Sequence, residues 1–351
     1  MVSGSSGKST TTKFLVQILE NQGLRVFTNP STANIKQGLF SAVLQGSKGF
    51  SLPNADIAVI EMDEAYANKI GAPLNPRLSV LTNVMDEQLD RFNDSEVVQN
   101  SLRFLALASG KVIANGNDPS LAELQADNVQ FFGFSSGLAN SEAAPRYSIS
   151  QKSPIENLNY EIVETKALLL KTARGEIQVE LEDNGMHMAL NFAAAIAAAD
   201  QIVTHLDLDK LQQTAKSLQG VYGRDTLETI KGVQSRILLV QNHESFRLNL
   251  LRANDAEQLF MAIGTDVKDP SWLWGVDMSS LSKVDILTGH HAIAMKYRLL
   301  SCGVEVEDVM TDFDNSLQKF LSFEAPSKGE RVFIVTAETF KRMKRSLELS
   351  S

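Results

Sequence analysis

The chain has 351 residues, a net charge of −9 and 43% hydrophobic residues, which is typical of an acidic globular protein. The negative charge disfavours nucleic acid as the main partner, and no run of 18 apolar residues is available to cross a membrane. The single cysteine, Cys302, excludes an internal disulfide and a four-cysteine zinc site. With a polar N-terminus and no signal peptide, we expect a cytoplasmic protein of two domains.

The first part of the chain alternates helix-like and strand-like segments. Apolar residues recur at helical spacing over 8–21 and 95–108, and short apolar runs over 56–62, 78–84 and 111–116 are typical of buried strands. Short buried strands separated by helices predict a mostly parallel sheet that is covered by helices on both faces.

The pattern changes over about 135–183. This segment is first rich in Gly, Ser, Ala and Pro, and it then alternates polar and apolar residues in strand fashion. We predict a β-rich insertion there, with a hairpin turn at Ala173–Gly175. A helix with an alanine-rich centre is predicted over 187–203, and a domain boundary near Gly220–Arg224.

The last third of the chain again alternates strands and helices. Strands are predicted over 235–242, 258–264, 283–288 and 331–336, and helices over 245–252, 290–301 and after the last strand. Gly303 is positioned as a C-cap glycine. We therefore predict an α/β fold with an N-terminal domain over 1–221 and a smaller C-terminal α/β domain over 222–351.

A short run near the N-terminus resembles a phosphate-binding loop. Gly4 and Gly7 would let backbone N–H groups converge on phosphate oxygens, and Lys8 would bridge the β- and γ-phosphates. Ser9 or Thr10 would offer a hydroxyl to Mg²⁺, and the helix that starts here directs its positive end at the same anion. The predicted nucleotide site is Gly4, Ser6, Gly7, Lys8, Ser9 and Thr10. The alternative is a disordered Gly/Ser-rich start of the chain.

Polar residues follow the next predicted strands. Glu61 lies at the end of the run 56–62, and Asp63 and Glu64 follow it. Asn83 lies at the end of the run 78–84. Because parallel strands bind ligands at their carboxyl edge, we predict Glu61 and Glu64 as Mg²⁺ ligands beside Ser9, and Asn83 as a nucleotide contact. The alternatives are a solvated strand end for the acidic residues and helix capping for Asn83.

Taken together, these stretches resemble the Mur ligase superfamily, and within it the MurT-like members. The phosphate loop, the strand-end glutamate, Asn115–Pro119 and the helix containing Asn191 look like superfamily motifs. Four further stretches resemble MurT-like chains: Asp86–Phe92 (DEQLDRF), Tyr222–Asp225 (YGRD), Thr288–Gly303 and the tryptophan segment, Asp269–Asp277 (DPSWLWGVD). The tryptophan segment is the specific part, because it contains both tryptophans.

The resemblance implies a central ATP-binding domain, a C-terminal Rossmann-like ligase domain, and ATP and Mg²⁺ as cofactors. It implies a partner, a GatD-like glutaminase, with which such proteins amidate the D-glutamate α-carboxylate of lipid II through an acyl phosphate. Asp269 is implied to orient ammonia, Arg224 to reach the γ-phosphate and Asn242 to lie near the nucleotide. For Arg224 the alternative is a hinge salt bridge. The site of action is implied to be the cytoplasm, with peripheral contact at the inner face of the membrane.

The sequence departs from the MurT-like pattern in two places. The zinc ribbon of these proteins falls within Ser135–Asp183 here, where no cysteine is present, so no zinc is expected. Val2 and Ser3 leave room for only a stub of the strand that normally precedes the loop. Two other functions stay open: a Mur- or folylpolyglutamate-type ligase that adds an amino acid, and a catalytically silent scaffold that binds a glutaminase.

Overall fold

The computed structural model describes the chain except for residues 31–33, 48–52, 86–94, 125, 148–156, 166, 182–184, 218–225, 241, 269 and 349–351. The described residues form two compact units, one up to residue 217 and one from residue 226 onward. Each unit contains its own sheet and its own buried apolar clusters. The two units are therefore described separately.

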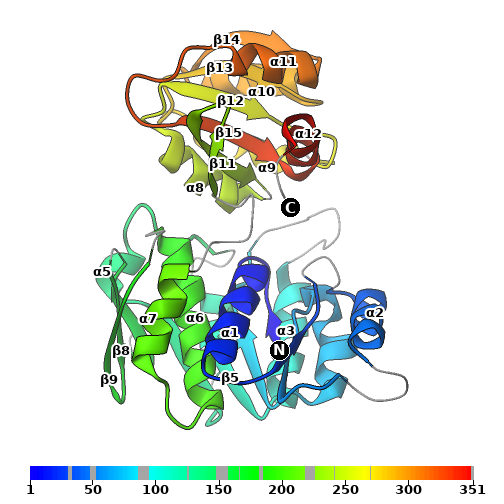
Figure 1. The fold of residues 1–351 in the computed structure, drawn as a ribbon, viewed down its shortest axis with the longest axis vertical. Helices are drawn as coiled ribbons and strands as arrows, with labels where there is room; N and C mark the ends of the chain where they lie inside the picture. The colour runs from blue at the N-terminus through cyan, green and yellow to red at the C-terminus, as the bar shows by residue number, and fades with distance from the viewer. Residues whose placement is uncertain are drawn as a thin grey trace. The chain divides into compact units, whose positions relative to one another are not determined.

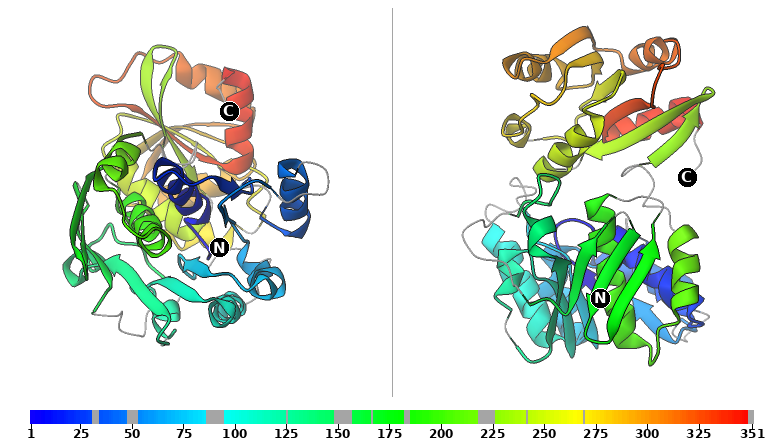
Figure 2. Two further views of the ribbon diagram at one scale, coloured as in Figure 1. Left: turned by 60° about the horizontal axis from the view of Figure 1, so that its bottom comes forward. Right: turned by 90° about the vertical axis from the view of Figure 1, so that its left-hand side faces the viewer.

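The first unit is built on a seven-stranded sheet in the order β1-β4-β5-β6-β7-β8-β9. Strands β1 to β7 are parallel, and β8 and β9 continue the sheet as an antiparallel hairpin, which faces the viewer on the right of Figure 2. The strands of this sheet are β1 (Val2–Ser3), β4 (Leu78–Leu81), β5 (Lys111–Asn115), β6 (Val129–Phe134), β7 (Tyr160–Glu164), β8 (Ala167–Thr172) and β9 (Gly175–Glu180). The unit also has a separate two-stranded parallel sheet of β2 (Val26–Thr28) and β3 (Ile57–Val59).

Helices cover both faces of this sheet, because successive strand residues point to opposite sides. Val80 and Ile113 pack under α1, α6 and α7, which lie on one face (Figure 1), whereas Leu81 and Val112 pack against α3 on the other. The helical elements are α1 (Lys8–Asn21), α2 (Lys36–Gly46), η2 (Glu64–Tyr66), η3 (Ala67–Gly71), η4 (Ala72–Leu74), α3 (Ser95–Ala108), α4 (Pro119–Ala122), α5 (Ser136–Ala139), α6 (Met186–Ile202) and α7 (Leu208–Ser217).

Strand β1 has only two residues, yet it is hydrogen-bonded on both sides. Thr82 N donates to Ser3 O at 3.0 Å, and on the other side Val2 N donates to Ile60 O at 2.8 Å. An isolated parallel bridge between Val2 and Glu61 connects the small β2–β3 sheet to the same edge. The stub that the sequence predicts is therefore present as a strand that is hydrogen-bonded on both sides and ends directly at the glycine-rich loop.

The second unit has a six-stranded sheet in the order β10-β11-β15-β12-β13-β14, in which only the β10–β11 pair is antiparallel. One face packs against α8, α9 and α10 and the other against α11 and α12. Its elements are β10 (Thr226–Ile230), β11 (Val233–Val240), α8 (His243–Ala253), β12 (Gln258–Ala262), α9 (Ser271–Trp274), β13 (Lys283–Thr288), α10 (Ala292–Ser301), β14 (Glu305–Met310), α11 (Phe313–Leu321), β15 (Arg331–Thr336) and α12 (Ala337–Leu347).

The predicted α/β class with helix-covered parallel sheets is confirmed. The helix over 95–108 and the strands over 283–288 and 331–336 are found at the predicted residues. Gly303 follows α10 with φ +79°, as expected for a C-cap glycine. The strand predicted over 56–62 is shorter and spans only Ile57–Val59, and the edge strand β14 was not predicted.

Candidate functional site

The glycine-rich loop connects β1 to α1 at the carboxyl edge of the first sheet. Gly4 has φ +136° and Gly7 has φ +82°, conformations that residues with a Cβ rarely adopt. A Cβ on Gly4 would lie 2.3 Å from Thr82 Oγ1 and 2.9 Å from Asn83 N and O. The loop therefore needs glycine at Gly4 both for its backbone angles and for its close approach to the neighbouring strand end.

The end of β4 fixes the conformation of this loop. Asn83 Oδ1 accepts a hydrogen bond from Ser6 N at 2.7 Å, and Asn83 O accepts one from Ser5 N at 2.8 Å. Thr82 Oγ1 donates to Ser6 O at 2.7 Å. Asn83, which was predicted as a nucleotide contact, thus holds the loop backbone in place through hydrogen bonds.

The loop leads directly into the first turn of α1. The hydrogen bond from Thr11 N to Gly7 O, at 2.9 Å, marks the first helical turn. The N–H groups of a first turn lack intrahelical acceptors and point along the axis, which makes such a turn an anion site. The predicted residues from Gly4 to Thr10 are therefore brought together in an arrangement that fits a polyphosphate.

Lys8 places its ammonium group inside the loop. Lys8 Nζ donates to Ser5 O at 2.8 Å and to Gly4 O, and it forms an ion pair with Glu64 Oε2 at 2.8 Å. The Lys8 and Glu64 side chains are only 12% and 4% exposed. The acidic partner of Lys8 is thus a buried carboxylate from the neighbouring strand end, and the role of Glu64 as a Mg²⁺ ligand stays a prediction.

Ser9 and Glu61 form the second polar pair of the site. Ser9 Oγ donates to Glu61 Oε1 at 3.0 Å, and Asn34 Nδ2 donates to the same oxygen at 3.1 Å. Asn29 fixes the Glu61 backbone, accepting from its N–H at 2.9 Å and donating to its carbonyl at 3.0 Å. A hydroxyl beside a buried carboxylate, next to a phosphate loop, is a donor set that suits Mg²⁺. The residues present therefore fit a magnesium nucleotide.

Asn191 was not among the predicted site residues, although the helix that contains it was part of the family resemblance. It lies on α6, and its Oδ1 accepts a hydrogen bond from Thr11 Oγ1 at 3.3 Å. A Cβ on Gly7 would lie 2.3 Å from the same Oδ1. Asn191 therefore packs behind the loop, 184 positions further along the chain than Gly7, and no local sequence signal reports that contact.

Asp118 is a buried carboxylate behind the strand ends. Its oxygens accept hydrogen bonds from Val84 N and Ser120 N, and the residue is fully buried. Burial raises the pKa of Asp118 to about 7, although these backbone donors act in the opposite direction. The carboxyl group therefore binds its proton more tightly in the folded chain than in the unfolded chain.

This shift predicts that stability falls as pH rises. Because the folded pKa of about 7 lies above the ordinary aspartate pKa of 3.8, the stabilisation from this group is fully present below about pH 4 and is lost as the pH rises through about 7. Between pH 5 and pH 8 the free energy of unfolding of the first unit should fall by roughly 3 kcal/mol from this group. Urea unfolding followed by circular dichroism measures the difference.

The control for this prediction is Asp118→Asn, which cannot ionise. An asparagine oxygen accepts from only one of the two backbone donors, so at pH 5 the variant should be less stable than the wild-type chain by about 1–3 kcal/mol. Its loss between pH 5 and pH 8 should nevertheless be smaller than in the wild-type chain. Equal pH dependence in both proteins would contradict a raised pKa of Asp118.

The predicted site residues of the second unit are only partly described. Asn242 is the N-cap of α8: its Oδ1 accepts a hydrogen bond from Ser245 N at 2.7 Å, and Ser245 Oγ accepts one from Asn242 N. This capping box gives Asn242 a local structural role, and its place near the nucleotide stays a prediction. Arg224 and Asp269 lie outside the described residues, as does the acidic stretch 86–92, so their roles stay predictions.

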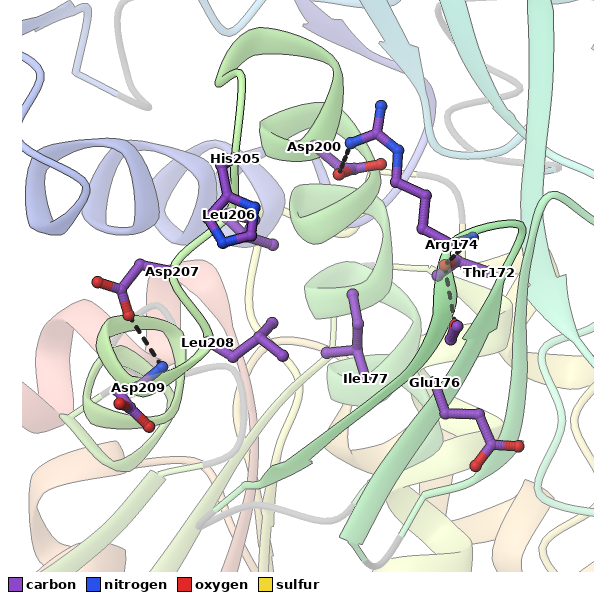
Figure 3. Close-up of a pocket in the computed structure, with 11 residues that line it drawn as sticks. Thr172, Arg174, Glu176, Ile177, Asp200, His205, Leu206, Asp207, Leu208 and Asp209 are labelled. Carbon is purple, nitrogen blue, oxygen red and sulfur yellow. Dashed lines mark hydrogen bonds and ion pairs between the residues drawn. The ribbon is translucent and has the colours of Figure 1, made fainter.

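A pocket of about 460 Å³ lies elsewhere on the first unit (Figure 3). It is lined by the β8–β9 turn, by Asp200 of α6 and by His205–Asp209 before and into α7. Arg174 and Asp200 form an ion pair at 3.0 Å on its wall. Gln22, just after the last residue of α1, bonds to Asp207, which places the pocket at the opposite end of α1 from the phosphate loop. It is therefore separate from the candidate site at the glycine-rich loop.

Comparison with known proteins agrees with this geometry. The Mur ligase middle domain model matches residues 2–199, which include the loop, both acidic residues and Asn191. The fold and site define a nucleotide-binding ligase domain, and the chain belongs to the Mur ligase family. None of the helices among the described residues has the length and apolar character needed to span a membrane.

Two curated relatives refine the placement within the family. The chain is 25% identical to the lipid II isoglutaminyl synthase (glutamine-hydrolyzing) subunit MurT of Streptococcus pneumoniae, over 82% of this chain and 72% of that one. It is 23% identical to the subunit of the same name from Staphylococcus aureus, over 99% of this chain and 87% of that one. The predicted MurT-like Mur ligase is confirmed.

A solved structure supports the fold. The pseudomurein peptide ligase type C from Methanothermus fervidus matches 99% of this chain and 77% of its own, with a TM-score of 0.74 and 18% identity. At this identity the likeness establishes the fold alone. The predicted Mur ligase architecture is confirmed by this match.

Proposed function

We propose that the chain is an ATP-dependent ligase subunit that amidates the α-carboxylate of D-glutamate in lipid II. The observation that carries this proposal is the pairing of Lys8 with Glu64 and of Ser9 with Glu61 around a phosphate loop. The names of the two MurT relatives supply the acceptor and the use of glutamine. A MurT-like protein of this kind works in the cytoplasm, with peripheral access to a lipid-linked substrate.

A carboxylate does not react with ammonia unless it is first activated. In the proposed reaction a carboxylate oxygen of the acceptor attacks the γ-phosphorus of ATP, and the bond to the ADP oxygen breaks. The nitrogen lone pair of ammonia then attacks the acyl carbon, and phosphate leaves with the electrons of the C–O bond. Phosphoryl transfer depends on positioning and charge neutralisation, which Lys8 provides directly.

The other residues take roles that follow from their chemistry. Ser9 and Glu61 would hold Mg²⁺, which neutralises phosphate charge when bound. Asp269 would orient ammonia and accept the proton that ammonium loses, and Arg224 would contact the γ-phosphate. Glu64 would keep Lys8 in the loop. Of these residues, Arg224 and Asp269 lie outside the described part of the chain, so their roles are assigned from the family resemblance.

A partner is expected to supply the ammonia. A glutaminase of the expected kind needs a nucleophilic cysteine with a partner histidine. Cys302 is the only cysteine, and it lies at the C-cap of α10, half-buried against the apolar cluster of the second unit. This environment is typical of a structural thiol. A GatD-like glutaminase subunit is therefore part of the proposal.

The proposal is tested with purified protein, ATP, Mg²⁺, lipid II and ammonium chloride. The wild-type chain should release phosphate and form amidated lipid II in equal amounts. Asp269→Ala should lower amide formation at least about a hundredfold, because positioned proton transfer typically contributes 10² or more. Asp255→Ala, which changes an exposed carboxylate at the end of α8, is the matched control and should behave like the wild-type chain.

The same assay separates the alternatives. Phosphate release that requires an amino acid instead of ammonium would replace the amidation proposal with an amino-acid ligase. A folded wild-type chain that binds no nucleotide and releases no phosphate would contradict both enzymes and favour the scaffold. Full activity of Asp269→Ala would remove that residue from the catalytic site.

A further inference from the structure

Helix α10 lies beside the tryptophan segment in the second unit. Leu273, Val276 and Met278, from the segment and just beyond it, are fully or almost fully buried. They belong to the same apolar cluster as the inward-facing residues of α10, namely Ala292, Met295 and Leu299. Apolar packing is non-directional, so it keeps the segment near the helix without fixing the position of its backbone along the helix axis.

Two directional hydrogen bonds fix the position of the segment along the helix. His291, the N-cap residue of α10, has its Nε2 2.7 Å from Val267 O. Arg298, seven residues further along, donates from Nη2 to Val276 O at 2.8 Å. A carbonyl oxygen only accepts hydrogen bonds, so the proton of a neutral His291 must lie on Nε2.

The two acceptor carbonyls belong to residues on either side of Asp269 in the sequence. Val267 precedes it by two residues, and Val276 is the next to last residue of the tryptophan segment. The donors are seven residues apart on one helix, which corresponds to about 10.5 Å along its axis. The same helix therefore fixes the backbone on both sides of the residue that the proposed function assigns to ammonia.

We propose that His291 and Arg298 are positioning residues, because they anchor Val267 and Val276, which flank Asp269 in the chain, to α10. This inference rests on the proposed function for its catalytic consequence, whereas the anchoring itself is independent of it. A shift of about 1 Å in a catalytic group is enough to cost on the order of a hundredfold in rate. Neither residue needs to touch a substrate for this effect.

The anchoring is tested first without any activity measurement. Amide hydrogen exchange is measured on peptides that cover 263–280 in the wild-type chain, His291→Leu and Arg298→Met. Each variant removes one donor while keeping apolar bulk, and each should speed exchange near its own anchor about tenfold. Lys296→Ala, on the same helix between the two anchors, is the control and should leave exchange unchanged. Wild-type exchange rates in both donor variants would overturn the proposal.

Conservative variants separate a lost donor from a damaged fold. His291→Gln keeps an N–H group near the position of Nε2, and Arg298→Lys keeps a charged donor. Both should recover most of the wild-type protection. If His291→Gln exchanges as fast as His291→Leu while the global unfolding transition is unchanged, the hydrogen bond to Val267 O is not what anchors the segment, and the proposal fails.

The catalytic consequence is tested with ammonium as the nitrogen source. His291→Leu and Arg298→Met should lower kcat or raise KM for ammonium about tenfold, with unchanged ATP affinity, because the phosphate loop belongs to the other unit. The double variant should lose less than the product of the two single losses, since both anchors fix one segment. If the exchange data support anchoring but the wild-type chain forms no amide, the proposed function fails and the anchoring stands. Wild-type kinetics in both variants would overturn the positioning role.

Discussion

Replacing Lys8 by alanine is expected to lower ATP-dependent phosphate release by about a hundred- to a thousandfold, as is typical when one preorganised charge-stabilising donor is removed. Lys8 Nζ lies within the loop, 2.8 Å from both Ser5 O and Glu64 Oε2, and the side chain is only 12% exposed. No other described lysine donates to a loop carbonyl of Gly4–Gly7. Steady-state phosphate release with ATP and Mg²⁺ measures the loss.

The ion pair between Lys8 and Glu64 allows a second experiment that separates the effect of Lys8 on activity from its effect on stability. Lys8→Ala alone leaves a buried carboxylate without its ion pair, which typically costs about 3–5 kcal/mol of stability. The double variant Lys8→Ala/Glu64→Gln removes both charges, so it should regain much of that stability and none of the activity. Lys111→Ala, at the amino end of β5 and far from the carboxyl edge, is the control and should remain active. An active double variant would show that Lys8 serves stability alone.

Replacing Gly4 by alanine is expected to destabilise the first unit by at least about 3 kcal/mol and to abolish nucleotide binding. The strain has two sources: φ +136° at Gly4, and a Cβ 2.3 Å from Thr82 Oγ1 and 2.9 Å from the Asn83 backbone. The backbone neighbours cannot move aside as a flexible side chain could. Nucleotide titration and urea unfolding measure the two effects separately.

Gly23→Ala provides the matched control for Gly4→Ala. Gly23 has φ +99°, yet a Cβ there would meet nothing within 4 Å, so only backbone strain of about 1–2 kcal/mol is expected. Both tryptophans lie in the second unit, so tryptophan fluorescence should follow that unit and stay unchanged in either variant, while circular dichroism reports on both. Equal stability losses in Gly4→Ala and Gly23→Ala would contradict the steric argument.

The parts of the site that could be predicted from the sequence are those with local causes, and their chemical roles stay predictions. A glycine-rich turn directly before a helix and polar residues at the ends of apolar runs are neighbours in sequence as well as in space. The sequence could not assign partners within the acidic cluster. Glu61 meets Ser9 and Glu64 meets Lys8, although the two glutamates are only three residues apart. That choice depends on where the turn after β3 directs each side chain.

The sequence by itself determined the α/β class and the MurT-like placement and predicted the phosphate loop, because each of these rests on periodicity or on motifs written in short runs of residues. Only the tertiary structure decided that β1 is hydrogen-bonded on both sides, since its hydrogen bonds are with Ile60 and Thr82 on two different neighbouring segments. The same holds for Asn191 behind Gly7 and for the two anchors on α10. Such contacts join segments far apart in the chain, and they exist only once the sheets and helices have packed.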